Sequence, residues 1–167
     1  DGRRFLCTIP NARGIDEIWV SELDNPGLRR LGTDPNASCH WPVWSPDGNR
    51  IAYIRQGKDG AAGVYVQGAD GGDATRVLKP ESDEVSYFAN SWMPDGSALL
   101  LWRSAPGQAG ITRLPLKSDG ADAANMRPMF SSRFHHYLPI ISPDGHLLAY
   151  GSDETGEIVV YVLELRA

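Results

Sequence analysis

The stretch Trp44-Ser45-Pro46-Asp47-Gly48, followed by Asn49-Arg50-Ile51-Ala52-Tyr53, decides how this sequence is organised. Related stretches stand at 92–96, which reads Trp-Met-Pro-Asp-Gly, and at 141–145, which reads Ile-Ser-Pro-Asp-Gly. The Asp-Gly pair at positions 1 and 2 is the remnant of a further copy. The glycines stand at 2, 48, 96 and 145, so the steps are 46, 48 and 49 residues. Self-similarity at such a fixed period is typical of repeat architectures.

Each copy has the chemistry of a tight turn. Proline pre-sets φ at the first central position of a type I turn, aspartate tolerates the second, and glycine closes the turn at the fourth. Apolar residues on both sides indicate strands, so each copy predicts a β-hairpin. One Pro-Asp-Gly turn means little, but three copies and a remnant at near-constant spacing predict a repeat.

Composition narrows the class of protein. With 167 residues and a mean hydropathy of −0.33, the chain is typical of a soluble globular domain with a buried core. Its net charge of −5 is scattered and includes no basic patch, which argues against a nucleic-acid partner. No run approaches the roughly 18 apolar residues of a membrane span. An initiator methionine and a signal peptide are absent, so we expect a mature or excised segment.

The two cysteines do not predict a metal site. Cys7 stands five residues after its glycine, where the other copies have Tyr53, Leu101 and Tyr150, so we expect a buried small apolar side chain. Cys39 stands at the entry to the next copy, and a disulfide between the two stays open.

The copies predict up to four strands each. The third strands share an apolar-aromatic-apolar pattern at 18–20, 64–66 and 160–162, whereas the third copy has Pro115 there. Because proline cannot donate to a ladder, we expect that strand to be bulged or irregular. Fourth strands are expected at 28–32, 75–79 and, less regularly, 126–130. The first copy lacks its first strand and the last copy lacks its fourth.

Repeated four-stranded units of this length predict an all-β fold, a β-propeller with four-stranded antiparallel blades, of which about three and a half are present. The expected blades cover residues 1–35, 36–80, 81–131 and 132–167. Trp44, Trp92 and Ile141 stand four residues before their glycines, and we expect them to plug the gaps between adjacent blades.

These stretches resemble the TolB-like, WD40-like β-propeller repeat family. The similar stretches are 44–53 with 64–72, 92–101, and 141–150 with 160–162. The third copy departs from the family pattern at Met93 and Pro115. The resemblance implies part of a longer propeller and, from the family alone, a periplasmic or extracytoplasmic location. It allows three settings: a TolB-like scaffold, the gate of a prolyl-oligopeptidase-like peptidase, and the sensor of a bacterial receptor-type serine/threonine kinase.

Aromatic and histidine residues recur seven to nine positions before each glycine. In a propeller the innermost strand begins at one mouth of the central channel, so we expect these side chains to meet at a rim. Such a rim suits recognition of a protein or peptide, although part of the set would equally fill gaps between blades. We call these six the rim residues: His40, Trp41, Tyr87, Phe88, His136 and Tyr137.

No catalytic set is present in the sequence. A Gly-x-Ser-x-Gly elbow, a phosphate-binding glycine loop and the kinase motifs are all missing. His40, His135 and His136 come from different copies without ligand spacing, so no zinc site is expected. We therefore expect a non-enzymatic, cofactor-free scaffold that binds protein partners in an envelope-associated assembly. The alternatives are the accessory propeller of a peptidase or kinase, and a channel that binds a small ligand or sugar.

Overall fold

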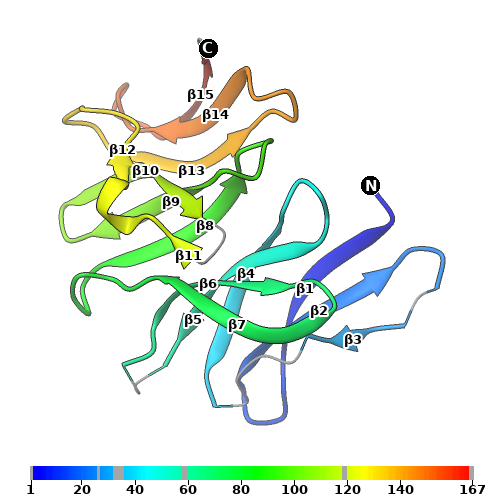
Figure 1. Cartoon of the computed structure of the whole chain (residues 1–167). Helices are drawn as coiled ribbons and strands as arrows, with labels where there is room; N and C mark the ends of the chain where they lie inside the picture. The colour runs from blue at the N-terminus through cyan, green and yellow to red at the C-terminus, as the bar shows by residue number, and fades with distance from the viewer. Residues whose placement is uncertain (1, 26, 32–35, 58–59, 118–119, 166–167) are drawn as a thin grey trace. The chain divides into compact units, whose positions relative to one another are not determined.

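A computed structural model describes residues 2–25, 27–31, 36–57, 60–117 and 120–165. The chain divides into two compact units, Asp1–Lys79 and Pro80–Ala167. Each unit contains two antiparallel sheets, and no α-helix occurs within the described ranges (Figure 1). The all-β prediction is therefore confirmed.

The first unit contains one three-stranded and one four-stranded sheet. The strand orders follow the sequence, β1-β2-β3 and β4-β5-β6-β7, as expected for consecutive hairpins. The expected fourth strand at 28–32 is reduced to the two residues of β3, and position 32 lies outside the described residues. The strands are β1 (Arg4–Pro10), β2 (Asp16–Glu22), β3 (Arg29–Arg30), β4 (Ser38–Trp44), β5 (Arg50–Gln56), β6 (Gly63–Gly68) and β7 (Gly71–Leu78).

The second unit contains a five-stranded and a three-stranded sheet. The larger sheet has the order β11-β10-β9-β8, with β12 also paired to β10, and the smaller has the order β13-β14-β15. The elements are β8 (Ser86–Trp92), β9 (Ala98–Ala105), β10 (Gln108–Lys117), β11 (Gly120–Ala121), the 3-10 turn η1 (Ala123–Asn125), β12 (Arg127–Pro128), β13 (His136–Ile141), β14 (Leu147–Ser152) and β15 (Val159–Glu164).

The Pro-Asp-Gly motif forms the turn that its chemistry predicts. Gly48 donates its N–H to the carbonyl of Ser45 at 2.9 Å, and Gly145 bonds Ser142 in the same way at 2.9 Å. The Ser45 hydroxyl also accepts the N–H of Arg50 at 2.9 Å, which ties the turn to the strand that follows. Gly48 has φ +69°, a conformation that glycine adopts without steric cost. The motif at 45–50 is thus a hairpin turn that the Ser45 side chain helps to close.

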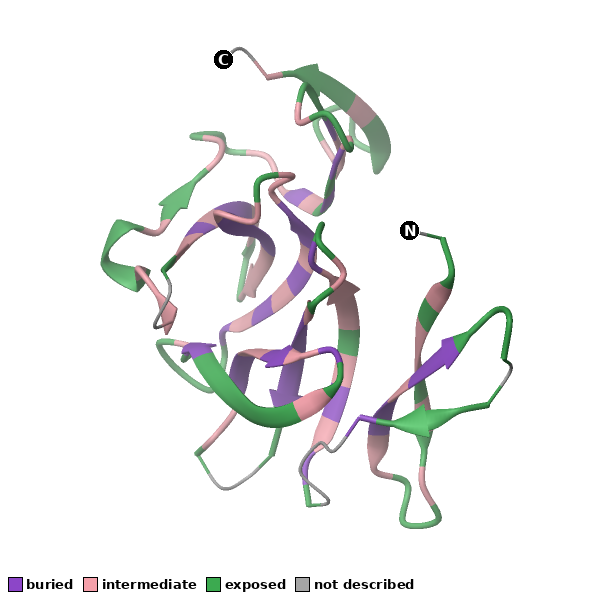
Figure 2. Cartoon of the chain, turned by 45° about the vertical axis from the view of Figure 1, so that its right-hand side comes forward, coloured by how far each residue is buried: buried purple, intermediate pink, exposed green. Residues whose placement is uncertain are grey.

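Apolar side chains of successive sheets form the core within each unit. Figure 2 colours the buried parts of the chain purple. In the first unit Trp44 packs against a cluster that includes Ile18 and Val20 of the preceding sheet. In the second unit Ile141 packs with Leu100 of the preceding sheet. These two contacts show the gap-filling role predicted for positions four residues before the glycine.

Three local predictions were wrong. Strand β10 is regular through Pro115, because the register with β9 is continuous from Gln108↔Ala105 to Pro115↔Ala98. The carbonyl of Pro115 accepts the N–H of Asp122 at 2.8 Å, so the backbone groups of Pro115 face away from β9 and the missing N–H removes no bond of the β9–β10 ladder. The expected strand at 126–130 is two residues long. Cys7 is half-buried rather than buried, because β1 is the edge strand of its sheet, and both cysteines are free thiols.

Candidate functional site

Bulges in the first strands position the rim residues. The register with the neighbouring strand shifts between His40 and Val43 in β4 and between Tyr137 and Ile140 in β13. Inside these bulges Trp41 has φ +55° and Leu138 has φ +48°. Both stand seven residues before a repeat glycine and directly before a proline. The left-handed region costs roughly 1–2 kcal/mol for a residue with a side chain, so the surrounding sheet holds both residues in a strained conformation.

The same bulges turn two large apolar side chains outward. Trp41 is 48% exposed and Leu138 is 45% exposed. Strained backbone is concentrated at functional sites such as ligand clamps. Sequence reasoning selected Trp41 but missed Leu138, and the signal that could have found it is the proline that follows at the same place in both copies.

The rim residues divide between the two faces of their strands, because successive side chains of a strand point to opposite sides. Tyr87 and His136 are buried, at 1% and 7% exposure, so these two side chains serve packing rather than an open surface. His40, Phe88 and Tyr137 are half-buried and Trp41 is exposed. Binding through these four residues stays a prediction.

In the first unit His40 and Trp41 border an open pocket of about 360 Å³. Nδ1 of His40 lies 3.1 Å from Oδ2 of Asp16, which fixes the orientation of the ring. Cys7 and Pro42 also line this pocket. The pocket therefore combines an oriented imidazole with the face of an exposed indole.

In the second unit Phe88 and Tyr137 belong to one row of rings. Phe88 stacks on Trp102 with centroids 4.7 Å apart, and Trp102 lies 6.1 Å from Tyr137. His135 follows at 6.2 Å from Tyr137. Burial raises the pKa of Tyr137 above its usual value, so this phenol is neutral at physiological pH. The row spans two sheets and presents aromatic edges that are partly open to solvent.

The two buried rim residues, Tyr87 and His136, and the neighbouring His135 all have partners within the fold. The Tyr87 hydroxyl donates to Oε1 of Glu81 at 2.6 Å, and burial together with this bond raises the pKa of Tyr87 to about 12. His136 stacks on Phe130 with centroids 4.6 Å apart, and burial lowers the pKa of this imidazole. His135 pairs with Asp153, with Nδ1 2.8 Å from Oδ2. The histidines thus have structural partners in the fold.

The described ranges contain no group of three or more histidine, cysteine, aspartate or glutamate side chains suited to a metal ion. Within the same ranges no helix is both long and apolar enough to cross a membrane.

Two kinds of curated protein are similar to this chain in sequence, a peptidase and TolB proteins. It is 24% identical to the "Uncharacterized peptidase YuxL" of Bacillus subtilis, an alignment that covers 83% of this chain and 25% of the relative. It is 33% identical to the Tol-Pal system protein TolB of Ruthia magnifica, over 61% of this chain and 23% of the relative. The chain therefore spans about a quarter of the length of these curated relatives.

The fold is that of part of a β-propeller. The structure of a putative TolB from Agrobacterium tumefaciens superposes with a TM-score of 0.78 at 18% identity, covering 98% of this chain and 55% of that chain. TolB proteins are periplasmic, and this resemblance supports a periplasmic or extracytoplasmic location. The family model described as the TolB beta propeller domain matches residues 1–167. The chain belongs to the TolB beta propeller domain family.

Proposed function

We propose that this chain is a protein-interaction module and that it recognises its partner through the bulged first strands. The observation that carries the proposal is the pair Trp41 and Leu138, which hold large exposed apolar side chains in left-handed backbone at one repeat position. Exposed aromatic anchors beside half-buried rings are the usual centres of protein interfaces. His40 adjoins Trp41 in β4 of the first unit. In the second unit Tyr137 adjoins Leu138 in β13, and Phe88 is linked to Tyr137 through Trp102.

One relative supports the kind of assembly that we propose. TolB of Ruthia magnifica is named as a protein of the Tol-Pal system. We accordingly propose a partner in an envelope-associated assembly and no catalytic role for the propeller itself. This role needs an accessible surface and rigid presentation, both of which the bulges provide.

Site-specific photo-crosslinking tests the proposal and identifies the partner in the same experiment. A benzophenone amino acid replaces Trp41, Leu138 or Tyr137 in cells, and mass spectrometry identifies the protein that is captured. Asp73 on β7, also exposed, is the matched control position. The same protein captured from Trp41 and Leu138 but not from Asp73 supports the proposal. Capture that is equal at all positions, or absent at Trp41 and Leu138, contradicts it.

A second function is favoured by one comparison. The similarity to an uncharacterized peptidase covers 83% of this chain, which supports an accessory propeller in a peptidase. Hydrolysis of aminoacyl p-nitroanilides by the full-length protein would establish this alternative. The kinase alternative stays a prediction, which autophosphorylation of the full-length protein would test.

A further inference from the structure

The β9–β10 hairpin extends beyond the strand that should cover its outer edge. Its ladder continues as far as Gln108↔Ala105, whereas β12 pairs with β10 only at Thr112 and Arg113. The final bond on that edge runs from the Met129 N–H to the carbonyl of Ile111, at 2.8 Å. The end of the hairpin, at positions 108–110, therefore has no fourth strand beside it in the described chain.

Alternation along β10 shows which backbone groups this leaves open. Because the carbonyl of Ile111 bonds Met129, the backbone groups of Ile111 face the outer edge rather than β9. Two residues earlier, the N–H and C=O of Ala109 face the same way. An exposed donor and acceptor on a strand edge are a template for pairing with another strand.

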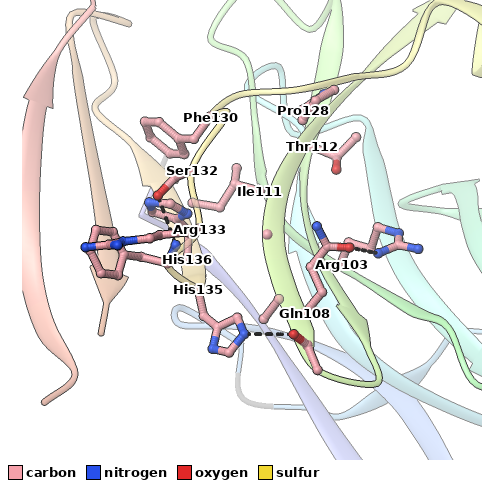
Figure 3. Close-up of a pocket in the computed structure, with 14 residues that line it drawn as sticks. Arg103, Gln108, Ile111, Thr112, Pro128, Phe130, Ser132, Arg133, His135 and His136 are labelled. Atoms are coloured by element: carbon pink, nitrogen blue, oxygen red, sulfur yellow. Dashed lines mark hydrogen bonds between the residues drawn. The ribbon is translucent and has the colours of Figure 1, made fainter. Parts of the chain in front are cut away.

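A pocket of about 270 Å³ lies beside this edge (Figure 3). One wall is formed by Gly107 in the hairpin turn and by the first half of β10 as far as Thr112. The other is formed by the segment from Phe130 to His136, the first residue of β13. The ring of His135 points toward the hairpin, and its Nε2 lies 3.1 Å from the carbonyl oxygen of Gly107. The open edge of β10 therefore forms one side of a groove, and side chains of the 130–136 segment form the other side.

The charged residues that line this pocket are all basic, and no aspartate or glutamate lines it. Two of them have acidic neighbours outside the pocket: Arg103 lies 3.9 Å from Glu81, and His135 pairs with Asp153 at 2.8 Å. The guanidinium of Arg133 lies over the ring of Phe134 at 4.9 Å, and no ion pair of Arg133 is found within the described residues. Figure 3 shows Arg103 and Arg133 on opposite sides of the pocket.

We propose that this groove binds an extended acidic peptide segment of a partner protein, which pairs as a short strand with β10 at Ala109 and contacts Arg133 through a carboxylate. Main-chain bonds to an open edge supply affinity in this mode of recognition, and pockets beside the edge supply specificity. The groove adjoins the start of β13 at His136, but the two proposed contacts, at Ala109 and Arg133, lie outside the bulges at Trp41 and Leu138. The two proposals can therefore be tested separately.

A fluorescence-polarisation titration tests the groove directly. The probe is a short fluorescein-labelled peptide of alternating glutamate and valine, compared with the same peptide carrying lysine in place of glutamate. We expect saturable binding of the glutamate peptide, weakening as salt increases, and at least about tenfold weaker binding of the lysine peptide. Equal binding of the two peptides, or binding of neither, would overturn the proposal.

Two variants separate the main-chain and charge contributions. Ala109→Pro removes the outward N–H without removing a bond to β9, so it should leave thermal unfolding unchanged and weaken the glutamate peptide about tenfold. Arg133→Glu should weaken it at least as much, whereas Lys79→Glu, an exposed site with the same change in charge, should not.

Amide hydrogen exchange by NMR provides a readout that does not depend on either variant. Peptide binding should slow exchange at Ala109 and leave Trp41 unchanged. Arg133→Glu that binds as the parent does, or unchanged exchange at Ala109 under saturating peptide, would contradict the proposal. Absence of crosslinking at Trp41 and Leu138 would contradict only the first-strand surface.

Discussion

At the scale of single residues, His136 shows what burial does to a repeat position. Its imidazole is 7% exposed and packs with the rings of Phe130 and Tyr150, whose centroids are 4.6 Å and 5.5 Å away. Burial lowers its pKa, and the charges of Asp153 and Glu154 oppose this effect only in part. The imidazole of His136 therefore binds a proton less readily in the folded state than in the unfolded chain, where a histidine titrates near pH 6.5.

This difference predicts acid sensitivity. Because the unfolded state binds the proton more tightly, the His136 contribution to the free energy of unfolding is complete above the unfolded pKa and falls as pH drops below about 6.5. Urea unfolding at pH 8 and pH 5.5 would measure it. His136→Phe keeps a ring in the stack and should reduce the loss at pH 5.5, whereas His146→Gln on the exposed turn should not. An unchanged pH dependence in His136→Phe would show that other groups cause the loss.

Strand β4 carries two tryptophans whose expected roles differ. Trp44 packs on the core cluster, and the guanidinium of Arg4 lies 4.7 Å above its ring while donating to the Gly48 carbonyl. Trp41, three residues earlier, is exposed in the bulge. We predict that Trp44→Ala lowers the free energy of unfolding by about 3 kcal/mol.

Trp41→Ala is the matched control. It should cost less than about 1 kcal/mol, because an exposed side chain loses little buried area. Urea unfolding of both variants measures the difference. Equal midpoints for Trp44→Ala and the parent would remove Trp44 from the core.

At the scale of the elements, turns and most strands could be predicted from the sequence because their causes are local. The Pro-Asp-Gly turns depend on the backbone preferences of adjacent residues, and the alternating strands depend on which face is apolar. The prediction of an irregular strand at Pro115 was wrong because the sequence does not show which edge of β10 the proline nitrogen faces. The bulges at Trp41 and Leu138 depend on pairing with residues of the next strand, and the only sequence signal for them was the proline that follows both residues.

The site was less predictable than the fold for the same reason. The spacing to the glycine selects equivalent positions in successive first strands, but position along a strand does not tell which of two adjacent side chains points inward. Tyr87 and His136 are buried, whereas Phe88 and Tyr137 remain partly open. The groove beside β10 had no sequence signal, because it results from a fourth strand that is shorter than the hairpin it accompanies.

At the scale of the whole molecule, one face of the sheet β13-β14-β15 is exposed although its side chains are apolar. In the last sheet Ala149 pairs with Ile140 on one side and with Val162 on the other, so these side chains share one face. Val160 pairs with Gly151, two residues after Ala149, and therefore lies on the same face. These three side chains are 61%, 64% and 77% exposed. In the preceding sheet the residue at the repeat position of Ala149 is Leu100, which is fully buried against Ile141 and Leu148.

This contrast predicts that Val160 and Val162 contribute to association rather than to the stability of the 167-residue chain. Val160→Lys with Val162→Lys should lower binding of the dye ANS and reduce self-association, measured by fluorescence and sedimentation velocity, because lysine breaks the apolar patch. The free energy of unfolding should change by less than about 0.5 kcal/mol, as for other exposed positions. Leu148→Ala should instead cost about 2–5 kcal/mol and leave the patch in place. A large loss of stability in the double lysine variant would contradict the prediction, because it would mean that this face is covered in solution.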